Sequence, residues 1–282
     1  MTSPDRSRVW LITGTSSGFG RRLAEAALAH GDRVVATARR PESLDDLVAR
    51  DPDRALAVAL DVMDRAQIAS AVEAALDRFG RIDVLVNNAG HGSVGAVEEI
   101  DLGDLRRLME TMFFGPVALT QAVLPHMRER GSGAIVQMSS MGGQVAYPGF
   151  GAYCAAKFAL EGLTEALAAE VAPHGIRVLL PEPGSFRTGF AGAGLQQSRE
   201  LDAYADTVGR TREFITGMDG RQPGDPAKAA AAIVAALDEP EPLRLALGAD
   251  AVDVMGEALG RRRADLEGYA DVSRAAVFDD AA

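Results

Sequence analysis

A tyrosine and a lysine stand four positions apart in the stretch GAYCAAKFAL, as Tyr153 and Lys157. Residues with this spacing lie on the same face of a helix. An ammonium group beside a phenol favours the phenolate and lowers the pKa of the phenol from about 10. A tyrosine adjusted in this way can give a proton to a developing alkoxide or take one from an alcohol. We predict that Tyr153 is a general acid and base and that Lys157 supports it.

A glycine-rich turn near the N-terminus has the chemistry of a phosphate site. The stretch TGTSSGFG follows an apolar run and leads into a helical pattern, with the spacing G-x-x-x-G-x-G. Glycine lets the backbone approach a pyrophosphate, and a helix N-terminus favours its negative charge. A purely structural turn is the alternative. The residues expected at the phosphates are Gly14, Ser16, Ser17, Gly18, Phe19 and Gly20.

The second apolar run ends in ATARRPE, where an NAD site usually has an acidic residue for the ribose 2′-hydroxyl. A guanidinium at this place suits a 2′-phosphate, because it can bind two oxygens at once. We predict NADP(H) in preference to NAD(H), with Arg39 as the main contact and Arg40 assisting. A solvent-facing basic pair is the alternative. Asp61 and Val62, after the third run, are expected at the adenine, although Asp61 could instead cap a helix.

Positioning these groups requires an alternation of strands and helices. Seven apolar runs, nearly continuous in hydrophobicity, are typical of strands covered on both faces. Amphipathic segments that end in glycine separate them. The pattern predicts a doubly wound α/β fold, with a mostly parallel seven-stranded sheet and helices on both faces. The runs occupy residues 9–13, 33–38, 55–60, 82–87, 133–138, 176–180 and 243–247.

Composition limits the classes of function. The 282 residues carry a formal charge of −11, so a nucleic-acid partner is not expected. The first apolar stretch is too short for a signal peptide or a membrane span, and we predict a cytoplasmic protein without a membrane partner. The one cysteine, Cys154, is interpreted as a small buried hydrophobe rather than a nucleophile. No cluster has metal-ligand spacing, so no catalytic metal is predicted.

The ordered set of motifs resembles the short-chain dehydrogenase/reductase family. TGTSSGFG, NNAG at 87–90, a serine before a loop, YCAAK at 153–157 and PG at 183–184 follow one another in the family's order. The resemblance implies one Rossmann-type domain over residues 1–282. It also implies a homodimer or homotetramer, associated through the regions 105–130 and 150–172. We expect a substrate lid at about 186–222, with a surface excursion of short helices as the alternative, and a C-terminal helical extension at about 250–282.

The resemblance also assigns roles to residues. Ser140, thirteen positions before Tyr153, would hold the substrate oxygen, and Ser139 is the competing candidate. Lys157 would also contact the nicotinamide ribose. The remaining residues expected at the cofactor are Asn88, Ala89, Gly90, Pro183, Gly184, Phe186 and Thr188, together with Tyr153 itself. Candidate substrate-pocket residues are His91, Met141, Gln144, Tyr147, Phe150 and Phe186.

One position departs from the family pattern. The family often has a catalytic asparagine where this chain has Met112, and a thioether cannot bind the water that relays protons to the lysine. Another group or a water could complete the relay, activity could be reduced, or the site could have been altered. Met112→Asn should distinguish these, since a rise in turnover would indicate a broken relay.

The predicted function is the reversible, NADPH-dependent reduction of a ketone or aldehyde to an alcohol. The nicotinamide would supply hydride and Tyr153 the proton. The chain would thus be an oxidoreductase acting on a small carbonyl or alcohol substrate. A non-enzymatic NADP(H)-binding sensor is the alternative from another class, and Met112 favours it. A sugar-nucleotide epimerase or dehydratase is a further one, but those enzymes usually have a larger C-terminal domain.

Overall fold

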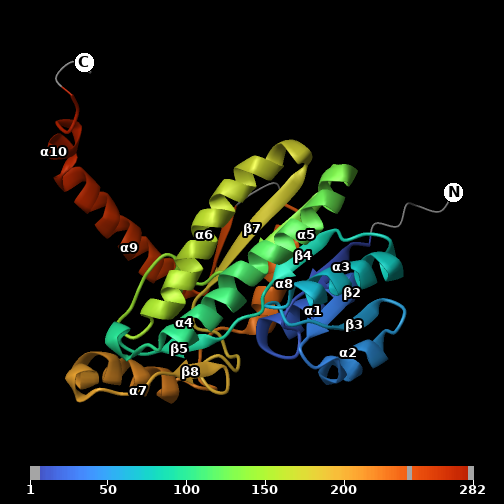
Figure 1. Cartoon of the computed structure of the whole chain (residues 1–282), viewed down its shortest axis with the longest axis horizontal. Helices are drawn as coiled ribbons and strands as arrows, with labels where there is room; N and C mark the ends of the chain where they lie inside the picture. The colour runs from blue at the N-terminus through green and yellow to red at the C-terminus, as the bar shows by residue number, and fades with distance from the viewer. Residues whose placement is uncertain (1–6, 240–242, 279–282) are drawn as a thin grey trace.

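The computed structural model describes residues 7–239 and 243–278. Within them, seven strands form one parallel sheet in the order β3-β2-β1-β4-β6-β7-β9 (Figure 1). This confirms the predicted fold class and strand positions. The strands are β1 (Val9–Ile12), β2 (Arg33–Ala38), β3 (Ala55–Ala59), β4 (Val84–Asn87), β6 (Gly133–Gln137), β7 (Ile176–Pro183) and β9 (Arg244–Leu247).

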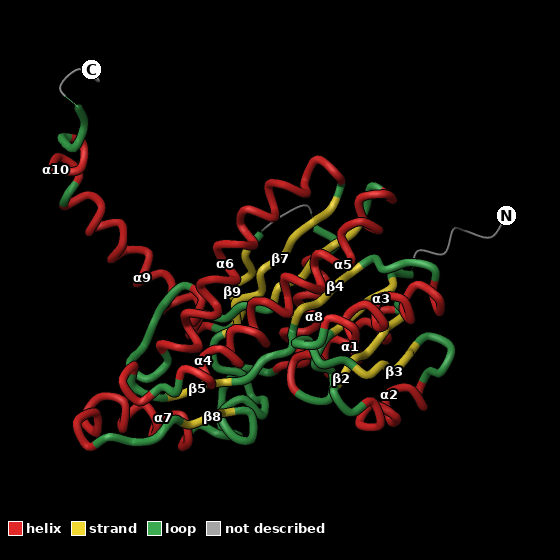
Figure 2. The backbone as a smooth tube through the Cα atoms, viewed as in Figure 1, coloured by secondary structure: helices red, strands yellow, loops and turns green. Residues whose placement is uncertain are grey.

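Helices cover the sheet and extend beyond it (Figure 2). Two of them, α9 and α10, run away from the sheet at the C-terminal end (Figure 1). Residues 279–282 of the expected C-terminal extension lie outside the described residues. The helices are α1 (Gly18–His30), α2 (Asp45–Arg50), α3 (Arg65–Phe79), α4 (Leu102–Met109), α5 (Gly115–Arg130), α6 (Gly151–Val171), α7 (Arg210–Gly217), α8 (Pro226–Ala236), α9 (Ala249–Gly268) and α10 (Ala270–Arg274).

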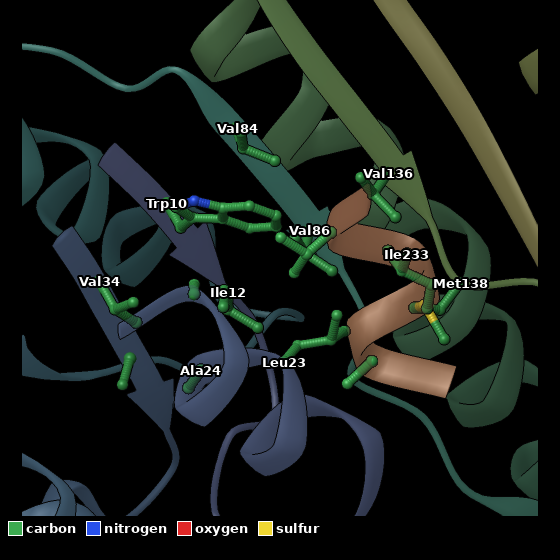
Figure 3. Close-up of a cluster of buried hydrophobic side chains, with 14 of the residues drawn as sticks. Trp10, Ile12, Leu23, Ala24, Val34, Val84, Val86, Val136, Met138 and Ile233 are labelled. Carbon is green, nitrogen blue, oxygen red and sulfur yellow. The ribbon is translucent and has the colours of Figure 1, made fainter. Parts of the chain in front are cut away.

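Each face of the sheet has its own apolar core, because successive strand residues point to opposite faces. Trp10 and Ile12 of β1 pack with Leu23 of α1 and Ile233 of α8 (Figure 3). Leu11, between them in the strand, packs on the other face with side chains of α3, α5 and α6. Burial on both faces accounts for the continuous apolar runs in the sequence.

Glycines end two of the predicted helices at the expected places. Gly31 after α1 and Gly80 after α3 have φ angles of 98° and 75°, in the left-handed region that glycine adopts without strain. The start of α3 is capped by Asp64, whose side chain accepts hydrogen bonds from the N–H groups of Ala66 and Gln67. Asp61 is therefore not the helix cap.

The strand order places a ligand crevice. β1 lies between β2 and β4, so the chain winds outward in both directions from the gap between β1 and β4. In doubly wound folds ligands bind outside the carboxyl ends of the strands at such a switch point. A small second sheet joins β5 (Gly92–Val94) to β8 (Leu195–Gln197), and it brings the segment 186–222 beside this edge. In the described residues no helix has the length and apolar character needed to cross a bilayer.

Candidate active site

The glycine turn lies at the end of β1 and is fastened to the turn after β4. Nδ2 of Asn88 donates to the carbonyl oxygens of Thr13, at 2.8 Å, and Gly14, at 3.2 Å. The N–H groups of Asn88 and Ala89 both donate to Oγ1 of Thr13 at 2.9 Å. Asn88 therefore holds the two loops in register.

Two glycines of the turn are required by its shape. Gly14 has a φ of +69°, and a Cβ there would lie 3.0 Å from the Cα of Ala89. A Cβ at Gly20 would lie 2.5 Å from Nδ2 of Asn88 and closer still to the carbonyl oxygen of Gly14. Gly20 therefore sits beneath the turn and does not line the cleft. No side chain caps the N-terminus of α1, so its first N–H groups remain available to an anion.

Both arginines after β2 line the cleft and are exposed. Among the described residues, neither has an acidic side chain within salt-bridge distance. Arg39 is close enough to His91 for its positive charge to lower the pKa of that imidazole. Burial is the larger cause of the lowered pKa, and a hydrogen bond with Gln196 opposes it. Arg39 thus presents an unneutralised charge at the edge of the cleft.

Asp61 and Val62 follow β3 and also line the cleft. The carboxylate of Asp61 accepts a hydrogen bond from the N–H of Met63 at 3.0 Å, and its own N–H donates to Oε1 of Gln67 at 2.8 Å. These contacts fix the turn that leads into α3. One carboxylate oxygen of Asp61 is left for a ligand.

Ser140 follows β6 and begins a short turn of 3₁₀-helix, Met141–Gly143. Its Oγ accepts from the N–H of Gly142 at 3.0 Å and donates to the carbonyl oxygen of Pro183 at 3.4 Å. Ser140 is also hydrogen-bonded to Tyr153. Ser139, its competitor, points elsewhere: it is buried, and its Oγ has no hydrogen-bond partner in the described part of the chain.

Tyr153 and Lys157 share one face of α6, as their spacing predicts. The Tyr153 ring packs edge-on against Phe150 and Phe190, with centroid distances of 6.2 and 5.2 Å. Nζ of Lys157 donates to the carbonyl oxygen of Met138 at 2.6 Å and lies 5.8 Å from the centre of the tyrosine ring. The site therefore combines a phenol, a hydroxyl and an ammonium at the end of β6.

The expected lowering of the Tyr153 pKa is wrong for this structure. Burial raises the pKa of Tyr153 to about 12, and the hydrogen bond with Ser140 only partly opposes this. The ammonium of Lys157 donates to a backbone carbonyl, and its charge does not overcome the effect of burial on the phenol. Burial also lowers the pKa of Lys157 to about 8, against the opposing charge of Glu161. Position in the helix predicted the pairing but not that Lys157 is buried and Tyr153 partly buried.

Met112 occupies a single turn of π-helix, Glu110–Phe114, between α4 and α5. It is only 1% exposed and packs with Leu108, Ala152 and Ala156, while Tyr153 lies against the same cluster. A Cβ at Gly90 would lie 3.5 Å from its Cγ. The thioether therefore borders the cleft as a packed apolar side chain. π-helical turns are frequent at functional sites.

One cleft of about 1410 Å³ brings these groups together. Every predicted catalytic and cofactor residue lines it except Gly20. The cleft is also lined by Pro183 at the end of β7 and by Gly184, Phe186 and Thr188 after it; the rings of Phe186 and Phe19 are 5.1 Å apart. Of the predicted pocket residues, Gln144 does not line the cleft; it binds buried carboxylates instead.

Sequence reasoning missed two groups. Asp250, at the start of α9, accepts a hydrogen bond from the N–H of Ser185 at 2.7 Å and so fixes the turn after β7. The segment 186–222 also supplies unforeseen lining residues, for which its scattered aromatic and methionine residues were the only sign. The main apolar ones are Phe190, Leu195, Phe214, Ile215 and Met218.

The buried cysteine agrees with its prediction. Cys154 is 2% exposed, and burial raises the pKa of its thiol. Its Sγ lies 3.5 Å from the carbonyl oxygen of Val145. A thiol in this setting is not activated as a nucleophile.

Known proteins share this architecture and much of this sequence. Residues 8–199 match the family described as short chain dehydrogenase. A solved short-chain dehydrogenase from Streptomyces avermitilis is 56% identical with a TM-score of 0.91, over 96% of this chain and 100% of its own. Oxidoreductase BOA17 of Botryotinia fuckeliana is 42% identical over 96% of this chain and its own full length. The 3-ketodihydrosphingosine reductase of Bacteroides thetaiotaomicron is 38% identical over 80% of this chain and 82% of its own.

These likenesses extend beyond the site residues to nearly the whole length of the chain. The match covers the glycine turn, the tyrosine–lysine pair and the sheet that carries them. The chain therefore belongs to the short-chain dehydrogenase family and is a short-chain oxidoreductase.

Proposed function

We propose that this enzyme reduces a ketone or aldehyde to an alcohol with NADPH, reversibly. The observation that carries the proposal is the convergence of Ser140, Tyr153 and Lys157 on a cleft that also contains the glycine turn and Arg39, which has no acidic partner among the described residues. Acid/base groups, a phosphate cradle and a cationic rim in one space suit a dinucleotide and a small carbonyl compound.

The residues present fit a nicotinamide dinucleotide. The pyrophosphate belongs at the glycine turn, where Gly14 and Gly20 leave no room for side chains and the N-terminus of α1 is uncapped. Arg39 belongs at a 2′-phosphate, which supports NADP(H) over NAD(H). When bound, the nicotinamide supplies or accepts the hydride.

The chain's own residues handle the oxygen and its proton. Ser140 orients and polarises the carbonyl oxygen through its hydroxyl. Tyr153 gives its proton to that oxygen; its high pKa keeps the phenol protonated at neutral pH, as reduction requires. The ammonium of Lys157 then stabilises the phenolate that remains. Phe150 and Phe190 hold the tyrosine ring and exclude water from it.

The substrate belongs in the apolar part of the cleft, under the segment 186–222. Its lining is mostly aromatic and aliphatic, which suits a carbonyl compound with a bulky apolar portion. This segment is fixed rather than loose: Arg212 of α7 is paired with Glu99 at 2.6 Å, and both side chains are buried. We assign it the role of a substrate cover within a single domain. The homodimer or homotetramer stays a prediction.

A non-enzymatic NADP(H) sensor is the second candidate, because Met112 places an apolar side chain where the family often has an asparagine. The complete set of Ser140, Tyr153 and Lys157 weighs against it, since a sensor needs no acid/base chemistry.

An NADPH-oxidation screen over ketones, aldehydes and keto-esters tests the proposal, with NADH in parallel. We expect turnover with NADPH on substrates with a large apolar group. Binding of NADPH in a thermal-shift assay, with no turnover on any member of the panel, would support the sensor instead.

A further inference from the structure

Two carboxyl groups are buried behind the catalytic lysine, outside the cleft. Glu161 lies on α6 one helical turn beyond Lys157, and Glu182 lies on the last part of β7. They are 4% and 2% exposed. Acidic residues are seldom buried to this extent unless they are paired or hydrogen-bonded.

The two carboxyl groups share their donors. Nε2 of Gln144 lies 3.3 Å from Oε2 of Glu161 and 3.0 Å from Oε1 of Glu182. Nε of Arg244 lies 3.2 Å and 3.3 Å from the same two oxygens. Two oxygens that share two nitrogens lie near each other, and Glu182 is also hydrogen-bonded to Glu161. Neighbouring carboxylates resist double ionisation, so such a pair tends to keep one proton.

The surrounding charges do not neutralise the pair. Nη2 of Arg244 also binds Glu161 at 3.1 Å and the half-exposed Glu165 at 2.9 Å, so one guanidinium faces three carboxyl groups. Arg262 of α9 donates to the backbone oxygen of Gln144 and not to the pair. Burial, and then the charge of Glu161, raise the pKa of Glu182 to about 7.

The pair is coupled to the active site on two sides. The charge of Glu161 raises the pKa of Lys157 and so opposes the effect of burial. Ser139 precedes the catalytic Ser140 in the chain. A Cβ built at Gly143 would lie 2.6 Å from Oγ of Ser139 and 3.0 Å from Oε1 of Glu161. Both of these oxygens are buried without a hydrogen-bond partner in the described residues. Both oxygens therefore lie beside Gly143 of the active-site loop.

We propose that Glu161 and Glu182 share one proton near neutral pH, and that the charge of this pair sets the protonation of Lys157. This inference rests on the proposed reduction through Tyr153. The pair touches neither the cleft nor the reacting atoms, so both residues are positioning residues. Met112 offers no polar group to Lys157 on the side of the cleft. The carboxyl groups of Glu161 and Glu182, on the side away from the cleft, set the protonation of Lys157 instead.

The sign of the effect follows from the charges. When the pair loses its shared proton, a second negative charge appears behind Lys157 and favours the ammonium. Reduction needs that ammonium to stabilise the phenolate of Tyr153. Removing the charge of Glu161 lets Lys157 lose its proton at lower pH, so the alkaline limit of reduction must also move to lower pH.

The first test compares pH–rate profiles of kcat/KM for wild type, Glu161→Gln, Glu182→Gln and Glu165→Gln. We expect the alkaline limb to shift down by about one pH unit in Glu161→Gln, and by less in Glu182→Gln, because Glu161 is the carboxylate of the pair whose charge acts directly on the pKa of Lys157. Glu165→Gln is the matched control, since it removes another carboxylate from Arg244 on the same helix, and its profile should follow wild type. Melting temperatures verify that each variant is folded. Profiles of Glu161→Gln and Glu182→Gln that overlay wild type, or an equal shift in Glu165→Gln, would overturn the proposal.

The second test needs neither substrate nor cofactor. Infrared difference spectra of the free enzyme should show a protonated carboxylic acid that ionises near pH 7. In Glu161→Gln the band should titrate at lower pH than in wild type, because Glu182 has lost the charge of its neighbour while its burial remains. In Glu182→Gln the band of the pair should be lost, because the remaining carboxyl group keeps Gln144 and Arg244 without a second buried acid. It should persist in Glu165→Gln. Wild type without this band would also overturn the proposal.

The proposed function and the role of the acid pair can be tested separately. An active Tyr153→Phe enzyme would overturn the proposed function, while the infrared measurement would still decide whether the pair holds a proton. An inactive Tyr153→Phe enzyme combined with unshifted profiles in both glutamine variants would overturn only the role of the acid pair.

Discussion

Nζ of Lys157 lies 5.8 Å from the centre of the Tyr153 ring and donates instead to the carbonyl oxygen of Met138. The lysine is thus anchored to the end of β6, and the tyrosine keeps its proton in a buried site where its pKa is about 12. A phenol in this state is ready to donate. The arrangement favours the reduction direction at neutral pH, and the oxidation direction requires the phenol to be deprotonated first.

Removing the phenolic hydroxyl should abolish most turnover without disturbing the fold. We expect Tyr153→Phe to lower kcat by about 10²- to 10⁴-fold, the usual contribution of a positioned acid. Its ring contacts with Phe150 and Phe190 do not need the hydroxyl, so the melting temperature and cofactor affinity should stay near wild type. Steady-state kinetics and cofactor titration measure both.

Tyr147→Phe is the matched control for that experiment. Tyr147 also lines the cleft, and its hydroxyl has no hydrogen-bond partner in the part of the chain that the structure describes. Its removal should leave kcat within a few-fold of wild type. A large loss in Tyr147→Phe, with a small one in Tyr153→Phe, would reverse the assignment of the acid.

Reduction should decline on the alkaline side of about pH 8. Burial lowers the pKa of Lys157 to about 8, so above this pH the folded protein holds a neutral amine beside Tyr153. A neutral amine stabilises the phenolate poorly, and kcat/KM for reduction should fall by up to about tenfold per further pH unit. Alcohol oxidation, which needs the deprotonated phenol, should not fall in this range. A reduction profile that stays flat through about pH 10 would contradict this reading of Lys157.

The sequence was sufficient to predict the sheet and the groups on it. Strands covered on both faces must be continuously apolar, and seven such runs predicted seven strands near their observed bounds. The spacing of Tyr153 and Lys157 places them on one face because the helix period is fixed. Local rules of this kind do not depend on the rest of the fold.

The misses all depend on packing between distant segments. Burial raises the pKa of Tyr153, and one of the rings packed against it, Phe190, comes from a segment beyond the sixth strand of the main sheet. The sequence predicts Gln144 in the substrate pocket. In the structure its amide instead contacts Glu182 of β7, which also contacts Arg244 of β9. Spacing along the chain carries no information on such contacts.

We expect the substitution Met112→Asn to destabilise the enzyme rather than to raise its activity. Met112 is buried among Leu108, Ala152 and Ala156, so an asparagine would place a polar group in an apolar site at a cost of about 1–3 kcal/mol. Under our proposal the charge of the Glu161–Glu182 pair already sets the protonation of Lys157, so an added amide should not raise turnover. Thermal or urea unfolding and kcat measure the two effects.

Met112→Leu is the control for volume and polarity, since exchanges of similar size usually cost less than about 1.5 kcal/mol. It should keep wild-type turnover. A higher kcat in Met112→Asn than in both wild type and Met112→Leu would show that a missing amide limits proton supply.

Arg39 should determine the choice between the two cofactors, and Arg40 should not. Arg39 lines the cleft, influences His91 and has no acidic partner in the described residues, so its guanidinium is free for a 2′-phosphate. We expect Arg39→Asp to change the NADPH-to-NADH ratio of kcat/KM by about 10- to 100-fold toward NADH, the range for a lost charge-assisted contact. Arg40→Asp carries the same change of charge one residue later and should alter the ratio only a few-fold.

The free enzyme offers an independent readout: loss of the Arg39 charge should raise the pKa of His91 in an NMR titration. If the His91 titration shifts while the cofactor ratio does not, Arg39 lies at the cleft as described but does not contact the 2′-phosphate.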